Sequence, residues 1–284
     1  MSPDPSPDRV AQCAMLAMLF ELSSSPKPGN VDRCHDFSDI GFHHFLTSAV
    51  SAYPVFRKAA QSKGSVGSLI LEGVLAWQTW NLSSNTHFGS LVLMIPIAIA
   101  ARRPGELQAE LADVLEKTTV IDAIDFYCAF QKAKARVAEV DNFSLNDRNW
   151  QKTVSDSGNT LLDLMRLSSR HDIVAREWST NYERSFLLAD RLAEKIDRLG
   201  LNDCVVRTFL EALAEVPDSL ICAKFGEEKA HQVSEQAGEA LLDVTLGKAR
   251  ELDCDLLAQD INPGSTADLI AASLFISLLK GLRF

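Results

Sequence analysis

DRVAQCAMLAMLFEL, residues 8–22, shows the pattern that most of this chain follows. Its apolar residues recur every three or four positions, which predicts an amphipathic helix. The same spacing predicts a helix over 42–60 and others at about 65–80, 89–101, 105–116, 120–138, 158–167, 179–198, 201–213, 227–247 and 266–281. Alternating strand patterns joined by hairpin dipeptides are almost absent. We therefore expect an all-α protein.

Short breakers separate these helical runs, for example at Gly64, Gly200 and Pro217. None of them is long or compositionally distinct enough to be a domain linker, and no repeat of fixed period is present. The sequence therefore predicts a single globular domain over residues 1–284, built from roughly ten helices. Polar residues gather at the breakers, so we expect the active site at the loops that join helix ends.

Composition excludes several classes of protein. The net charge of −10 disfavours binding to nucleic acid or to an anionic membrane. Six cysteines without a CxxC pair argue against a structural zinc site and for a reducing compartment. The N-terminus is polar and acidic, unlike a secretory signal. The longest apolar run, 91–101, contains Pro96 and is too short to span a bilayer. We expect a cytoplasmic protein with neither nucleic acid nor membrane as a partner.

The most informative polar segment follows the first helix. PKPGNVDR (26–33) combines two prolines and a glycine, which fix an irregular backbone. This segment and the residues after it bring together both signs of charge, from Lys27, Arg33, His35 and the carboxylates of Asp32, Asp36 and Asp39. A rigid loop of this kind suits a polyphosphate and its metal ion. A purely structural loop is the alternative.

A second cluster, NTHFG (85–89), precedes an apolar helix. Asn85 or Thr86 is a natural N-cap for that helix. The same position suits an anion, because free backbone amides and the positive end of the helix dipole converge there. His87 adds a donor beside Gly89, where a ligand can approach the backbone closely. Both interpretations stay open.

Three further clusters lie at later breakers. HDIVAREWSTNYE (171–183) contains Asn181 and Glu183, and PDSLICAKFG (217–226) contains Asp218 at an expected helix start and the basic Lys224. In NPGSTAD (262–268), Ser265 or Thr266 is expected to cap the last helix. Asp268 would favour the helix dipole there, and it could equally hold Mg²⁺.

Familiar nucleotide-binding and hydrolase motifs are missing from the chain. It contains no GxGxxG or GxxxxGK[ST], which disfavours a Rossmann fold and a P-loop. It also lacks GxSxG and HExxH. A nucleotide would therefore have to be bound by loops at helix ends.

Taken in order, the clusters resemble those of the triphosphoribosyl-dephospho-CoA synthase family. The resemblance rests on PKPGNVDR with HDF (26–37), NTHFG (85–89) and NPGSTADLIAASLF (262–275), and it extends from about residue 8 to the C-terminus. It implies a transferase that joins ATP to 3′-dephospho-CoA, releasing adenine and forming 2′-(5″-triphosphoribosyl)-3′-dephospho-CoA. The transfer would occur at C1′ of the ATP ribose, with Mg²⁺ as the cofactor and nucleotides as the small-molecule partners.

The resemblance also suggests roles for residues, assigned by their charge and chemistry. Phosphate or nucleotide binding is expected of Lys27, Gly29, Asn30, Arg33, Asn85, Thr86, His87, Gly89 and Ser265. Catalytic carboxylates are expected at Asp32, Asp36 and Asp268, and metal ligands at Asp36, Asp39 and Asp268. Secondary candidates are His35, Asn181, Glu183, Asp218 and Lys224.

The chain departs from the better-known members in two ways. They carry lysine where this chain has Phe88, and they have a glycine-rich central segment in place of HDIVAREWSTNYE (171–183). The latter segment resembles a divergent branch found in archaea and methylotrophs. A related ribosyl or phosphoribosyl transfer in tetrahydromethanopterin-type cofactor synthesis is therefore an alternative, as is a non-catalytic nucleotide-binding protein. A homodimer is a further expectation.

Overall fold

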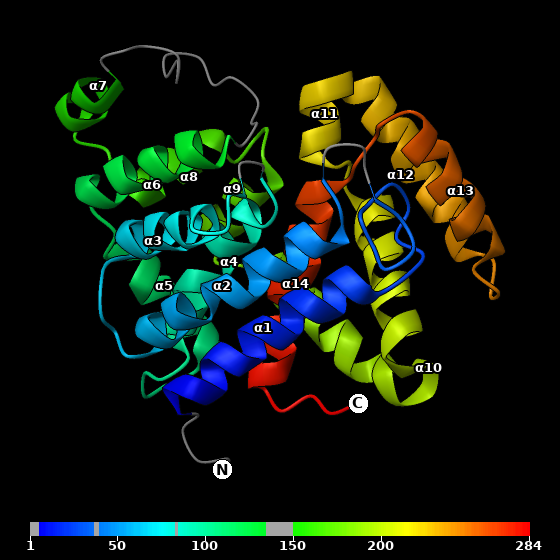
Figure 1. The fold of residues 1–284 in the computed structure, drawn as a ribbon, viewed down its shortest axis with the longest axis horizontal. Coiled ribbons are helices and arrows are strands. Elements are labelled where there is room, and N and C mark those ends of the chain that lie inside the picture. The colour runs from blue at the N-terminus through cyan, green and yellow to red at the C-terminus, as the bar shows by residue number, and fades with distance from the viewer. Residues whose placement is uncertain (1–5, 37–39, 83–84, 135–149) are drawn as a thin grey trace. The chain divides into compact units, whose positions relative to one another are not determined.

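The computed structural model describes residues 6–36, 40–82, 85–134 and 150–284 of the 284-residue chain. The described residues form helices and no strand, so the all-α class is confirmed (Figure 1). In chain order the helices are α1 (Pro7–Ser23), α2 (Phe42–Ala60), α3 (Val66–Gln78), α4 (Phe88–Ala100), α5 (Leu107–Glu116), α6 (Val120–Ala133), α7 (Trp150–Ser157), α8 (Leu161–Ser168), α9 (Ile173–Ser179), α10 (Glu183–Glu215), α11 (Ser219–Phe225), α12 (Glu227–Leu241), α13 (Gly247–Ala258) and α14 (Gly264–Leu279).

Most of the predicted helices are present, including the short α5 and α8, but other short helices were missed. α2 coincides with the predicted helix 42–60. The two helices expected on either side of Gly200 are there, joined as α10 across a kink at that glycine (φ 70°, ψ 167°). Three helices of 7 to 12 residues, α7, α9 and α13, lie where no helix was predicted, and of α11 only the start at Asp218 was expected. One to three turns offer too few repeats for the spacing of apolar residues to reveal a helix.

The described residues fall into two compact units. The first comprises those in 6–15, 47–134 and 150–183, and the second those in 16–46 and 184–284. The single domain predicted over 1–284 stays a prediction. No helix in the described part of the chain is long and apolar enough to cross a membrane.

The first unit is built around α4. Nearly every residue of α4 is buried, as expected for a helix that is apolar on all sides. α3 packs closely on α6 within this unit. The contact is made at Gly67, where an added Cβ would lie 2.2 Å from the carbonyl oxygen of Asp122. The Gly67 amide also donates to Asp122 Oδ1 at 2.8 Å, so the two helices share a hydrogen bond there.

The second unit is built around α14, which is also buried along almost its whole length. Ser277 on this helix donates to the backbone oxygen of Ala189 on α10 at 2.9 Å. α12 packs against both α11 and α13, and α12 and α13 lie side by side in Figure 1. The segment that follows α1 belongs to this unit, and it carries the cluster of polar residues described next.

Candidate active site

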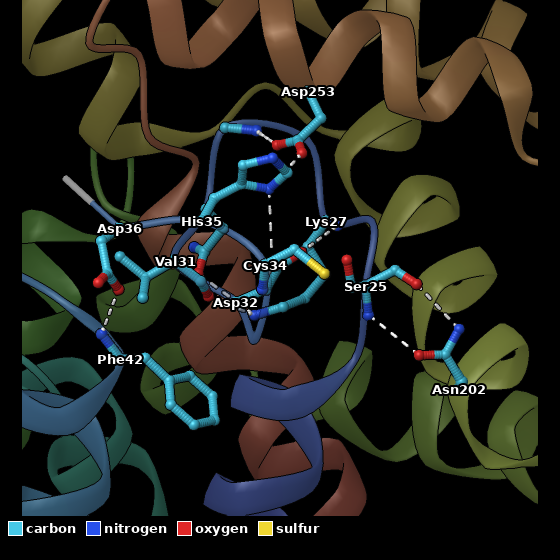
Figure 2. Close-up of polar contacts among 12 residues, drawn as sticks. Ser25, Lys27, Val31, Asp32, Cys34, His35, Asp36, Phe42, Asn202 and Asp253 are labelled. Carbon is cyan, nitrogen blue, oxygen red and sulfur yellow. Dashed lines mark hydrogen bonds and ion pairs between the residues drawn. The ribbon is translucent and has the colours of Figure 1, made fainter.

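The loop over residues 24–36 starts where α1 ends, and α10 fixes its first turn. The side chain of Asn202, two residues after the kink in α10, brackets the backbone of Ser25 (Figure 2). Asn202 Oδ1 accepts from the Ser25 amide at 3.1 Å, and its Nδ2 donates to the Ser25 carbonyl at 2.9 Å. Both polar groups of Ser25 are thereby satisfied by one side chain, which orients the chain that follows.

Lys27 lies inside this loop and is fully buried. Its ammonium donates to the Glu21 carboxylate on α1, to Asn30 Oδ1 at 3.3 Å and to the Val31 carbonyl at 3.3 Å. An ammonium has three donors, and all three are used here. The structure therefore contradicts the prediction that Lys27 binds phosphate directly: its charge neutralises Glu21. Burial raises the pKa of Glu21, against the opposing effect of the lysine.

Gly29 and Asn30 attach the loop to the C-terminal part of the unit. Gly29 has a φ of 71°, and a Cβ there would lie 2.3 Å from the Ile261 carbonyl oxygen. Its amide donates to Asp253 Oδ1 on α13 at 2.9 Å. Asn30 Nδ2 donates to Asn262 Oδ1 at 3.0 Å. Both residues, predicted to bind nucleotide, form structural contacts in this conformation.

Asp32, His35 and Asp253 form the one cluster of three or more potential metal ligands among the described residues. Their ligand atoms all lie within 4.8 Å of one another. His35 Nδ1 is 3.0 Å from Asp253 Oδ2 and 3.6 Å from Asp32 Oδ1 (Figure 2). Both carboxylates are buried, whereas 38% of the imidazole surface is exposed. The cluster therefore faces solvent through its histidine.

The electrostatics of this cluster favour a bound cation. Burial raises the pKa of Asp253 to about 6, and the nearby Asp32 contributes to the increase. The pKa of Asp253 is lowered, in the opposite direction, by the hydrogen bond from the Gly29 amide and by the charges of His35 and Lys27. Two carboxylates in a buried position are costly unless positive charge accompanies them. Their oxygens fit the preference of Mg²⁺, whereas the imidazole nitrogen does not.

The exposed edge of the loop runs from Arg33 to Asp36. It presents a guanidinium, a thiol, the half-buried imidazole and a carboxylate in succession. Asp36 Oδ1 accepts from the Phe42 amide at 2.6 Å and so caps the first turn of α2. Asp36 is outside the Asp32–His35–Asp253 cluster, and the predicted ligand Asp39 lies outside the described residues.

Asp218 is a structural residue that caps two helices. Its Oδ1 accepts from the amides of Leu220 and Ile221 at the start of α11. Its Oδ2 accepts from the amide and the hydroxyl of Thr266 at 2.7 and 2.8 Å. Neither Ser265 nor Thr266 caps α14 with its own side chain, contrary to prediction, because Asp218 already occupies this position.

α14 begins at Gly264, two residues earlier than predicted, and this shift affects the residues expected to act there. Asp268 lies beyond the first turn and is half-buried. Among the described residues it takes part in no cluster of potential metal ligands. Ser265 Oγ accepts a hydrogen bond from Ser219 Oγ at 3.0 Å, which links the starts of α11 and α14.

Burial raises the pKa of Asp218 to about 6, which predicts a specific pH dependence. The unfolded carboxyl titrates near pH 4, so between about pH 4 and 6 only the folded chain keeps this proton. Its contribution to the free energy of unfolding is therefore largest below pH 4 and decreases by about 3 kcal/mol as the pH rises through 6. Urea denaturation of the wild type and of Asp218→Asn at several pH values isolates this contribution as the difference between their free energies of unfolding.

The control is Asp197→Asn, an exposed carboxylate on α10, which should leave the pH profile unchanged. A wild-type minus Asp218→Asn difference that is flat or increases from pH 4 to 6.5 would contradict the assigned shift.

In the first unit, NTHFG forms the start of α4. Asn85 Oδ1 accepts from the Phe88 amide at 3.1 Å, so Asn85 acts as a cap, although the residue at the N-cap position is His87. His87 is buried, and its Nδ1 lies 2.6 Å from Ser48 Oγ. Thr86 is buried as well, and Gly89 is the second residue of α4.

Phe88 is buried in an aromatic cluster of the first unit. Its ring centroid lies 5.6 Å from that of Phe126 and 5.8 Å from that of Phe130, both on α6. An aromatic residue is therefore accommodated by two aromatic neighbours at the position where a lysine was expected.

The model of the ATP:dephospho-CoA triphosphoribosyl transferase family matches residues 7–283, nearly the whole chain. The chain belongs to this family. The match agrees with the extent of the resemblance found in the sequence, from about residue 8 to the C-terminus. Members of the ATP:dephospho-CoA triphosphoribosyl transferase family are transferases, so the predicted class of enzyme is confirmed as well.

Curated relatives in the triphosphoribosyl transferase family align end to end with this chain. An inferred 2-(5″-triphosphoribosyl)-3′-dephosphocoenzyme-A synthase from Pseudomonas savastanoi pv. phaseolicola is 25% identical over 296 residues, covering 96% of this chain and 92% of the relative. One from Pseudomonas fluorescens is 27% identical over 306 residues, with 98% and 94% covered. A crystal structure of a proposed triphosphoribosyl-dephospho-CoA synthase from Archaeoglobus fulgidus has a TM-score of 0.71 at 27% identity, covering 84% of this chain and 100% of that one.

Of the secondary candidates, His35 belongs to the cluster with Asp32 and Asp253, whereas Asn181, Glu183 and Lys224 take no part in it. Asn181 lies in a turn of the first unit, at a φ of 54°, where Nδ2 donates to the Gln108 carbonyl. Glu183 is exposed in the first turn of α10. Lys224 pairs with Asp260 at 2.5 Å on the surface of the second unit.

Two residues of the candidate site, Glu21 and Asp253, were not predicted from the sequence. Glu21 looked like an ordinary polar position near the end of α1. Asp253 has a recognisable signal, because it lies among the buried residues Ala249, Leu252 and Leu256 of α13. A carboxylate on the apolar face of a short amphipathic helix needs a partner, and here it has the Gly29 amide and His35.

Proposed function

We propose that this chain transfers the triphosphoribosyl group of ATP to 3′-dephospho-CoA and releases adenine. The observation that carries the proposal is the family match over residues 7–283, which leaves no large part of the chain for another activity. The loop over 24–36 supports it, because its exposed edge offers a cation, an imidazole and a carboxylate within four residues.

The reaction exchanges one bond at C1′ of the ATP ribose. The bond from C1′ to the adenine nitrogen breaks, and a bond from C1′ to the acceptor hydroxyl oxygen forms. The hydroxyl proton passes to a base, and adenine leaves with a proton from an acid. Positive charge develops at the ribose between these events, so a carboxylate nearby would stabilise the transition state.

We assign Arg33 to the triphosphate and Asp36 to the acceptor hydroxyl. Arg33 is exposed, and a guanidinium binds phosphate oxygens in a bidentate manner. Asp36 is exposed beside it, and its hydrogen bond to the Phe42 amide orients the carboxylate. Mg²⁺ bound to the triphosphate would neutralise its charge.

Adenine release tests the proposal directly. Purified protein with ATP and Mg²⁺ is expected to release adenine only when 3′-dephospho-CoA is added, as followed by chromatography. Asp36→Asn is expected to lower kcat by about 10²–10⁴-fold, because the amide keeps the cap but not the base. Arg33→Ala should instead raise the KM for ATP. Arg198→Ala, an exposed arginine on α10, is the matched control.

ATP binding without adenine release would overturn the proposal in favour of a non-catalytic nucleotide-binding protein. Normal turnover by Asp36→Asn would leave the transfer in place and remove only the assigned base.

The acceptor has an alternative, a tetrahydromethanopterin-type precursor. It is favoured by the segment HDIVAREWSTNYE (171–183), which resembles a divergent branch of the family found in archaea and methylotrophs. Transfer from phosphoribosyl pyrophosphate to a pterin-linked ribitol, with no response to 3′-dephospho-CoA, would support it. A homodimer in the cytoplasm is also part of this proposal, and sedimentation analysis of the purified chain tests the dimer.

A further inference from the structure

The ligand atoms of Asp32, His35 and Asp253 all lie within 4.8 Å of one another (Figure 2). His35 Nδ1 is within ion-pair distance of both carboxylates, yet it makes a hydrogen bond with neither. The nitrogen is thus close to the two oxygens but not aligned with them. A nitrogen that lies close to two carboxylates without a hydrogen bond to either is available as a ligand to a metal ion that they would share.

The spacing between these atoms also suits a metal ion. At metal–ligand distances of about 2.1 Å, neighbouring ligands of an octahedral ion lie about 3 Å apart. The observed separations of 3.0 and 3.6 Å from the imidazole nitrogen to the two carboxylate oxygens are close to that value. Little rearrangement would therefore be needed to bind an ion.

The carboxylates are held in place from outside the cluster. Asp32 Oδ1 accepts from the Cys34 amide at 2.7 Å, and Asp253 Oδ1 accepts from the Gly29 amide at 2.9 Å. Both side chains are at least nine-tenths buried. Hydrogen bonds of this kind orient metal ligands and usually matter for affinity.

We propose that Asp32, His35 and Asp253 bind a divalent first-row transition metal ion such as Mn²⁺, separately from any Mg²⁺ that ATP carries. Carboxylates suit Mg²⁺ and Mn²⁺ alike, but an imidazole ligand favours the transition metal. Three protein ligands leave coordination positions open. The open positions would accept an oxygen ligand such as water or a phosphate.

Titration of the metal-free protein with MnCl2 or MgCl2 alone tests this site without nucleotide. We expect one Mn²⁺ per chain, measured by the loss of the free-ion electron paramagnetic resonance signal and by calorimetry. The Kd for Mn²⁺ should be at least about tenfold lower than that for Mg²⁺. His35→Ala should weaken Mn²⁺ binding by about tenfold or more and remove the preference, and Asp253→Asn should abolish binding.

Matched controls are Asp255→Asn, exposed on the same helix as Asp253, and His231→Ala, exposed on α12. Both should bind Mn²⁺ like the wild type. His35 is only half-buried, so its variant is expected to fold even if Asp253→Asn does not, and circular dichroism checks both. Equal affinity for the two ions, unchanged binding by His35→Ala or no saturable site would overturn the proposal. Because no nucleotide is present, none of these results depends on the transfer reaction.

Discussion

Replacing Glu21 with leucine is expected to lower the free energy of unfolding by about 3–5 kcal/mol, because it leaves the Lys27 ammonium buried without a counter-charge. Lys27 is fully buried, and Glu21 supplies the one carboxylate to which its ammonium donates. The two remaining acceptors of the ammonium are neutral oxygens of Asn30 and Val31. Urea denaturation followed by circular dichroism measures the loss.

The double variant Glu21→Leu/Lys27→Met separates the buried charge from the packing. Replacing both partners with apolar residues of similar size should restore stability to within about 1–2 kcal/mol of the wild type, because no charge is then buried. A double variant as unstable as Glu21→Leu alone would show that the loop needs the hydrogen bonds of Lys27 and not merely charge balance.

Replacing Gly29 with alanine is expected to cost more than about 3 kcal/mol of stability and to displace the loop from α13. The new Cβ would overlap the Ile261 carbonyl oxygen, 2.3 Å away, and would approach the Leu256 side chain at 2.8 Å. The left-handed φ of 71° adds about 1 kcal/mol. Displacement would also break the bond from the Gly29 amide to Asp253, so Mn²⁺ binding should weaken in the same variant.

Gly158→Ala is the matched control for Gly29. Gly158 has nearly the same φ, 67°, but no atom lies within 4 Å of the Cβ that alanine would add. Gly158→Ala should therefore lower the free energy of unfolding only by the cost of the left-handed backbone conformation, about 1 kcal/mol. Equal losses of stability in the two variants would show that the close approach to Ile261 is unimportant.

Much of the fold could be predicted from the spacing of apolar residues. The full extent of α2 and the break at Gly200 follow from local patterns, which reach across a few turns at most. Helices such as α9 and α11 span seven residues each, and a segment of that length has no clear period. Asp172 and Asp218 cap these two helices, and only the helix start at Asp218 was expected from the sequence.

The position of the site could be predicted better than the roles of its residues. Charge and rigidity marked the loop around Asp32 as functional, and the cluster of metal ligands lies there. Charge sign alone could not distinguish Lys27, which is buried, from Arg33, which is exposed. Asp253 is 224 residues away from Gly29 in the chain, so no local pattern connects the two.

The three side chains that fix the loop over 24–36 from outside, Asn202, Asp253 and Asn262, all lie in the last third of the chain. The ribosome synthesises the loop early and these partners late, so the loop cannot adopt this conformation until most of the chain has been translated. A chain released before residue 253 would contain every residue of the PKPGNVDR segment and still lack the cluster with His35. The candidate site is therefore completed only near the end of synthesis.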